Sequence, residues 1–269
     1  TSTIILKKGE ETKYPVPYLV WKSTDGLPKE NEFLSDILDR IEISQKEAYP
    51  HDERDLTDIW VTIDKGEKKT KFVRGKNYYQ SRHGLVNDLN SVFFIDILDK
   101  HGKILTIQNR TERAKKKLQI VKTKIENDLI YPFLKPRNVK KWGMKGYLYG
   151  ILPQRKNGEK NESILRTQYP LTYKYLHMFK SDLLGRSSKW FKTKGIPFYS
   201  FFGLGDYSFA PYKIVWCCMS YQPSFSVVSK VYDKNIGNKE VMPDNTIGYF
   251  SVNNKSEAYV GMLLFVVFG

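Results

Sequence analysis

Alternating apolar and polar side chains predict two β-hairpins in the first 110 residues. In the first hairpin, Ile59–Ile63 pairs with Phe72–Val73 across a charged turn around Gly66. In the second, Val92–Leu98 returns as Ile104–Ile107 through a turn of sequence Asp-Lys-His-Gly. The early part of the chain is therefore expected to be rich in β-structure.

Apolar residues at spacings of three and four predict three amphipathic helices. The first covers Glu32–Ile43. The second begins after Thr111 among lysines and ends near Tyr131, because Pro132 disfavours helical geometry in the residue before it. The third runs from Pro170, a favourable first-turn residue, to a glycine that follows Leu184.

Aromatic and β-branched residues predict further strands at Tyr212–Cys218 and Ser224–Val231. We expect the apolar run Val260–Phe268 to be a buried element that the end of the chain cuts short. Together the patterns predict an α+β fold of mixed β-sheets with packed helices. Residues 1–70 form an N-terminal segment that the patterns assign to no domain, and residues 71–269 form the main domain.

The charge of the chain is concentrated in one stretch. The whole sequence carries a net charge of +15, and residues 110–160 hold fifteen Lys and Arg against four Asp and Glu. Such a basic helix and loop favours a polyanionic partner, which releases counterions on binding. A solvated, lysine-rich helix face is the alternative explanation of the same residues.

The remaining composition indicates a cytoplasmic protein. The two cysteines, Cys217 and Cys218, are adjacent and therefore poorly placed to bridge each other, which fits a reducing compartment. No secretory signal opens the chain, and no apolar run approaches the 18 residues of a membrane span. The four histidines lack the spacing of a structural zinc site.

Two weak catalytic patterns in the sequence have simpler explanations. Phe202–Gly205 resembles a glycine loop for S-adenosylmethionine, but the residues after it begin a helix poorly, so a loop with two flexible glycines is expected. Asp58, Glu67 and Lys69 loosely match the metal-binding pattern of restriction endonucleases. Because Glu67 and Lys69 fall in the predicted charged turn, we expect a solvated turn there.

Four stretches follow one another between residues 75 and 265. They are Tyr79–Leu85 with Asn90–Ile95, Ile125–Trp142, Tyr169–Leu176, and Pro197–Ser200 with Gly205–Trp216. In order and separation they resemble the C-terminal half of type IIG and related adenine-N6 DNA methyltransferases. In that family this half carries a TaqI-like specificity domain. The resemblance implies a target-recognition domain at residues 71–269.

One departure from the family limits what the chain does alone. The catalytic motif of these enzymes is Asn or Asp followed by two prolines and an aromatic residue, and this sequence has no adjacent prolines. In the family that motif binds the flipped adenine. The resemblance therefore implies a recognition module without catalytic residues or cofactor, whose S-adenosylmethionine and catalytic domain belong to a larger adenine-specific restriction-modification enzyme.

Candidate DNA contacts follow from the two tasks of sequence recognition, which are positioning on phosphates and contact with base edges. The predicted phosphate contacts are Arg137, Lys140, Lys141, Lys145, Arg155 and Lys156. Arg82 and Gln80 are predicted base contacts, because Arg pairs with guanine and Gln with adenine. Trp142 and Tyr207 are predicted to stack on or beside bases, with an ordinary core role as the alternative.

Two other functions stay open from the sequence. A metal-dependent DNA nuclease would need acidic ligands that converge on one ion. A non-enzymatic RNA-binding protein would also use positive charge with aromatic side chains. Sequence-specific recognition of double-stranded DNA accounts best for the resemblance and the charge together.

Overall fold

The computed structural model describes residues 3–5, 7–26, 31–65, 78–112, 114–220 and 224–268, without the side chains of 265–268. The chain divides into two compact units, Thr1–Lys76 and Asn77–Gly269. The domain boundary expected at residue 70 lies outside the described residues. Mixed sheets with several helices confirm the α+β class.

The N-terminal unit holds a three-stranded antiparallel sheet in the order β1 (Val16–Ser23), β2 (Ile41–Pro50) and β3 (Trp60–Asp64). The helix expected over Glu32–Ile43 is wrong for most of its length. A single turn, α1 (Leu34–Ile37), and a 3-10 turn, η1 (Leu38–Arg40), precede β2. The reason is pairing, since β2 forms a ladder with β1 in which Ile43 lies opposite Trp21.

The expected strand at Ile59–Ile63 is confirmed as β3, which pairs with β2. Its expected partner Phe72–Val73 lies outside the described residues, as do Glu67 and Lys69 of the nuclease pattern.

The larger unit is built on a six-stranded sheet in the order β16-β8-β11-β5-β6-β7. All neighbours are antiparallel except β16 and β8. The strands are β5 (Phe94–His101), β6 (Ile104–Asn109), β7 (Lys122–Glu126), β8 (Ile130–Leu134), β11 (Leu148–Ile151) and β16 (Met242–Pro243). The hairpin predicted from Val92 to Ile107 is confirmed as β5 and β6, although α2 (Asn90–Phe93) occupies its first residues.

The basic helix predicted between Thr111 and Tyr131 is wrong. This part of the chain forms strands β7 and β8, and β7 pairs with β6 so that Ile125 lies opposite Leu105. Within β7 the exposed Lys122 and Lys124 alternate with inward residues, a period of two that the wider helical spacing concealed. Burial of Ile125 in the main core decides the conformation.

The third predicted helix is confirmed, with a break at Phe179. It forms α4 (Pro170–Met178) and α5 (Lys180–Leu184), preceded by α3 (Glu162–Gln168). The buried carboxylate of Glu126 accepts hydrogen bonds from the backbone amide and hydroxyl of Thr172 at 2.8 and 2.6 Å. This carboxylate ties the start of α4 to the end of β7.

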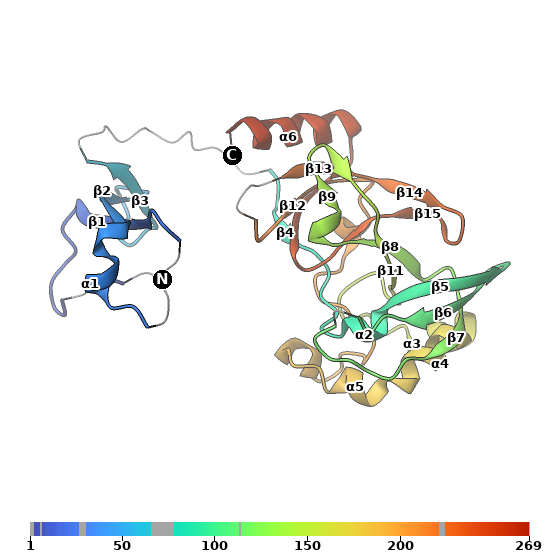
Figure 1. Cartoon of the computed structure of the whole chain (residues 1–269). Coiled ribbons are helices and arrows are strands. Elements are labelled where there is room, and N and C mark those ends of the chain that lie inside the picture. Colours follow the sequence, from blue (N-terminus) through green and yellow to red (C-terminus); the bar gives the residue numbers. More distant parts are fainter. Residues whose placement is uncertain are drawn as a thin grey trace. The chain divides into compact units, whose positions relative to one another are not determined.

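A second, four-stranded sheet runs in the order β13 (Phe225–Val228), β12 (Tyr212–Cys217), β17 (Ile247–Val252) and β4 (Arg82–His83). Helix α6 (Lys255–Phe268) packs on one face of it, at the opposite end of the unit from α3, α4 and α5 (Figure 1). The apolar run expected to be buried belongs to this helix. Met262 faces the sheet, whereas Val260 and Leu264 are about half exposed.

Short elements complete the unit. They are the hairpin β9 (Val139–Lys140) with β10 (Gly143–Met144), the hairpin β14 (Lys230–Asp233) with β15 (Gly237–Glu240), and the 3-10 helices η2 (Pro136–Asn138), η3 (Lys189–Lys192) and η4 (Asp206–Phe209). The hairpin of β9 and β10 and helix η4 carry predicted DNA contacts.

Two buried cations are structural. Arg186 stacks on the Phe191 ring, and its guanidinium donates to four backbone carbonyls, those of Asn87, Leu183, Phe198 and Ser200. Burial lowers the pKa of Arg186 to about 10. Lys213 in β12 donates to the Ala210 carbonyl at 3.1 Å, and burial lowers its pKa to about 8.

Candidate nucleic-acid interface

Arg82 lies on the edge strand β4 and is the centre of a small polar cluster. Its Nη2 atom donates to Oε1 of Gln80 at 2.5 Å. Its Cζ atom lies 3.7 Å from the centroid of the Tyr207 ring. Gln80, Arg82 and Tyr207, here called the Arg82 cluster, were predicted as base contacts from separate parts of the chain, and the fold brings them together.

Two residues that the sequence prediction missed hold Tyr207 in place. A Cβ atom on Gly205 would lie 2.5 Å from Cε1 of Tyr207, so the ring needs glycine at that position. The Ser251 hydroxyl donates to the Tyr207 carbonyl at 2.8 Å. The backbone of Tyr207 is therefore fixed by a hydrogen bond and its ring by packing on Gly205, which limits the conformations open to the guanidinium.

Arg82 belongs to a row of residues that crosses the four-stranded sheet. Arg82 pairs with Tyr249 of β17, Tyr249 with Val215 of β12, and Val215 with Ser226 of β13. Residues directly opposite in antiparallel strands project from the same face. The row therefore connects Arg82 at one edge with Ser226 at the other.

Ser226 holds the hairpin of β9 and β10, here called the basic hairpin. The Ser226 hydroxyl donates to the carbonyls of Lys140 and Gly143, the two residues that flank the turn. Lys141 and Trp142 form the turn, and both are exposed. Trp142 therefore lies near the β13 edge of the sheet, across from the Arg82 cluster with which it was grouped in the sequence prediction.

The base of the basic hairpin is fixed by Asn138. This buried side chain accepts from the backbone amide of Lys135 at 3.1 Å and donates to the carbonyl of Lys145 at 2.9 Å. Val139 packs in the core beneath the sheet. The cations of the hairpin thus stand on a rigid support.

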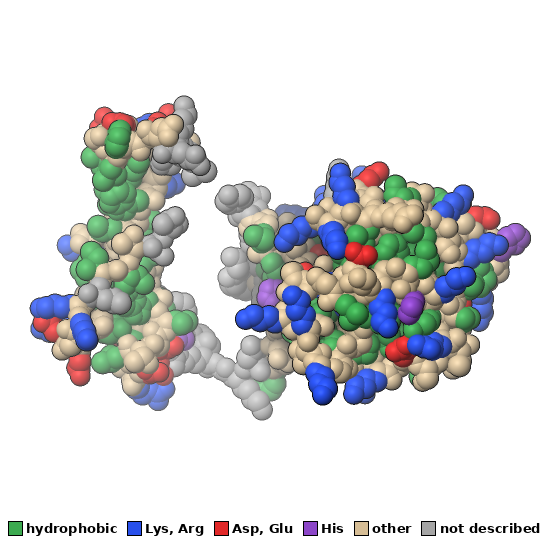
Figure 2. All heavy atoms as spheres, turned by 90° about the horizontal axis from the view of Figure 1, so that it is seen from below, with side chains coloured by type: hydrophobic (Ala, Val, Ile, Leu, Met, Phe, Trp, Pro, Cys, Tyr) green, Lys and Arg blue, Asp and Glu red, His purple; other side chains and the backbone are tan. Residues whose placement is uncertain are grey.

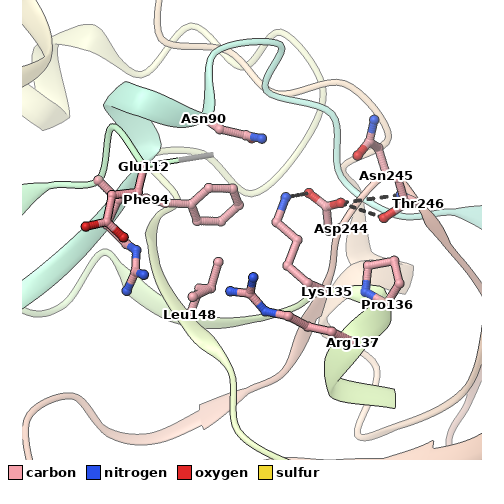
Figure 3. A pocket seen from close by; sticks show the side chains of 11 residues that line it. Asn90, Phe94, Glu112, Lys135, Pro136, Arg137, Leu148, Asp244, Asn245 and Thr246 are labelled. Atoms are coloured by element: carbon pink, nitrogen blue, oxygen red, sulfur yellow. Dashed lines mark hydrogen bonds and ion pairs between the residues drawn. The ribbon is translucent and has the colours of Figure 1, made fainter. Parts of the chain in front are cut away.

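Arg137 faces a pocket of about 640 Å³ between η2, α2 and the turn before β17 (Figure 3). Buried Asp244 pairs with Lys135 at 2.7 Å in this pocket. The Arg137 guanidinium points into the pocket beside Leu148 (Figure 3). No residue of the Arg82 cluster lines the pocket, so the two features are separate.

Arg155 lies close to η4 as well. Its Cζ atom is 3.9 Å from the centroid of the Phe209 ring, two residues beyond Tyr207. Lys156 follows it on an exposed loop. Of the predicted phosphate contacts, Arg155 thus lies beside Phe209, whereas Lys140 and Lys141 lie on the basic hairpin.

In the described part of the larger unit, the cations predicted to contact phosphates form no ion pairs with carboxylates. The ion pairs there involve other cations, such as Arg110 with Asp96 and Lys116 with Asp182. One face of this unit carries many scattered Lys and Arg side chains with few Asp and Glu among them (Figure 2). The charge is distributed over several loops and strands, and does not form one helix face.

The glycine loop at Gly203–Gly205 leads into the four-residue 3-10 helix η4. Gly203 has a φ of +79°, which favours glycine, and Gly205 makes room for Tyr207. Among the described residues, no three His, Cys, Asp or Glu side chains are grouped so that they could hold a metal ion. No helix in the described ranges has the length and apolar character needed to cross a membrane.

Comparison with known proteins gives one distant relative of interest. Over 136 residues, half of the chain, the sequence is 29% identical to the type II methyltransferase M.NspV of Nostoc sp. (strain ATCC 29411 / PCC 7524). The match covers 27% of the length of that protein. No family model matches the chain. The similarity supports a relationship between this chain and the methyltransferases of restriction-modification systems.

Proposed function

We propose that the chain is a double-stranded DNA recognition module, the target-recognition domain of an adenine-N6 DNA methyltransferase of restriction-modification type. The methyl-transfer site and S-adenosylmethionine belong, in this proposal, to a catalytic domain outside these residues. The relationship to a type II methyltransferase over a limited part of its length supports this assignment, as does the lack of adjacent prolines in the sequence.

The observation that carries the proposal is the stacking of Arg82 on Tyr207. A guanidinium held over an aromatic ring keeps its planar fork in one orientation, which suits two hydrogen bonds to O6 and N7 of guanine. The conformational entropy of this long side chain is then already reduced in the free protein, so DNA binding does not have to order it. Arg82 is therefore our candidate for direct base contact.

Gln80 has a different role in this proposal. Reading adenine requires both its oxygen and its nitrogen, and the oxygen accepts from Arg82. We assign Gln80 to positioning the guanidinium, and Tyr207 to supporting it from the other side.

Arg137, Lys140, Lys141, Lys145, Arg155 and Lys156 supply the phosphate contacts. All six are exposed, on η2, on the basic hairpin and on the loops that follow β10 and β11, which allows them to contact a duplex backbone. Such contacts give affinity without sequence preference and make binding sensitive to salt.

Selection from a pool of random-sequence duplexes tests the proposal directly. We expect enrichment of one short motif, and no incorporation of labelled methyl groups when the chain is mixed with DNA and S-adenosylmethionine. Methyl transfer by the chain alone would contradict the assignment. So would a preference for single-stranded RNA over duplex DNA in competition, or cleavage of plasmid in the presence of Mg²⁺.

A further inference from the structure

Trp142 has a backbone conformation that tryptophan rarely adopts. Its φ is +73°, in the left-handed region that favours glycine. Strain of this kind persists only where the surrounding structure enforces it, and it is concentrated at functional positions. A glycine at this turn would relieve the strain, so the large indole needs another explanation.

The side chain does not contribute much to the core. Half of the surface of Trp142 is exposed, at the tip of a two-residue turn. Its neighbour Lys141 places Nζ 5.6 Å from the indole centroid, and Lys140 is also exposed. The tip therefore combines a flat aromatic surface with two positive charges.

The support under this tip is rigid. Ser226 binds both carbonyls that flank the turn, and Asn138 bridges the two strands at their base. A rigid hairpin keeps the indole in place when another molecule presses against it, whereas a mobile loop would be displaced.

The sheet separates the support of the tip from Arg82. Ser226, which binds the carbonyls on both sides of the turn, and Arg82 lie at the two ends of one cross-strand row, three strand spacings apart. At about 4.8 Å per spacing, the backbones of Ser226 and Arg82 are about 14 Å apart.

We propose that Trp142 inserts at a base step of bound duplex DNA and partly unstacks it, on the same duplex whose base Arg82 contacts. Lys140 and Lys141 bind the phosphates beside that step. Apolar wedges of this kind unstack and bend duplexes at a cost of a few kcal/mol per step, which the added contacts offset. The inference rests on the proposed DNA-binding function and adds a distortion of the DNA to it.

A fluorescent duplex tests the inference without knowledge of the preferred sequence. The probe is an alternating dA-dT duplex of about 16 base pairs with 2-aminopurine in place of several adenines, whose TA steps unstack easily. At saturating protein and low salt, we expect the wild-type chain to raise 2-aminopurine fluorescence. Trp142→Ala should bind about 5- to 150-fold more weakly and, once saturated, give no rise.

Two further variants separate this role from folding and from charge. Trp142→Gly removes the strained side chain and should raise the melting temperature by about 2–4 °C while abolishing the fluorescence rise. Lys141→Ala, at the same tip, should weaken binding yet keep the rise at saturation.

The outcomes distinguish the two proposals. Failure of the wild-type chain to bind the duplex would refute the proposed function and this inference together. Binding without a fluorescence rise, a rise that persists in Trp142→Ala, or a lower melting temperature for Trp142→Gly would overturn the inference alone.

Discussion

Replacement of Arg82 by alanine removes a predicted base contact that is held in place before DNA binds. The guanidinium stacks on Tyr207 at 3.7 Å and is oriented by Gln80. The backbone at this position pairs with Tyr249 through the sheet ladder, so truncation of the side chain should leave the fold intact. The expected loss therefore lies in DNA recognition.

The magnitude follows from the contacts that Arg82 offers. A bidentate contact to guanine discriminates by about 1–3 kcal/mol, or about 5- to 150-fold in affinity. Stacking of a part-exposed guanidinium on tyrosine contributes about 0.5–1 kcal/mol. We therefore expect Tyr207→Leu to weaken specific binding by a few-fold, and the double variant to lose less than the sum of the two.

Fluorescence anisotropy with the selected duplex and a random duplex, side by side, measures this effect. Arg82→Ala should weaken binding to the selected duplex only. Arg82→Lys keeps the charge without the planar fork, so it serves as the matched control and should recover little of the specificity. An equal loss on both duplexes would show that Arg82 contacts phosphate or supports the fold, and the base-contact assignment would fall.

Four further predictions concern charge, packing and burial. Changing Lys140 and Lys141 together to Ala should weaken binding to all duplexes equally and reduce the salt slope by up to about two units, measured by titration at several salt concentrations. Gly205→Ala should displace the tyrosine ring that it contacts and lower specific binding while random binding stays unchanged. Arg186→Met should lower the unfolding free energy by at least about 3 kcal/mol in urea, because four buried carbonyls lose their donor. Lys213 has a pKa lowered to about 8, so the unfolded chain binds more protons above that pH. The contribution of Lys213 to stability should therefore rise by about 1–2 kcal/mol from pH 8 to 9.5, and it is measured as the difference in pH slope between the wild-type chain and Lys213→Met.

The outcomes that contradict these four predictions are equally specific. Unequal losses on selected and random duplexes would remove the phosphate role of Lys140 and Lys141. Unchanged specific binding in Gly205→Ala would show that the tyrosine platform is dispensable. Wild-type stability in Arg186→Met, or an unchanged pH slope in Lys213→Met, would contradict the burial on which those predictions rest.

The sequence by itself determined the fold class, the helix from Pro170 and the strands β5, β6 and β12. These elements have strong local signals, such as proline at a first helical turn and β-branched runs beside a glycine turn. It also determined the excess of positive charge and which residue types are suited to DNA. It did not determine the conformation of residues 111–131, where apolar spacing was compatible with a helix.

Tertiary structure decided the conformations and side-chain contacts that the local sequence pattern did not determine. Pairing with β6 made β7 a strand, because hydrogen bonds and the burial of Ile125 outweigh a helical spacing of side chains. Likewise, Arg82 and Tyr207 are 125 positions apart in the chain, and only the ladder between β4 and β17 with the turn at Gly205 places one on the other. Local sequence specifies which side chains are present, and long-range pairing specifies which of them meet, because contacts between distant segments depend on the whole packed sheet.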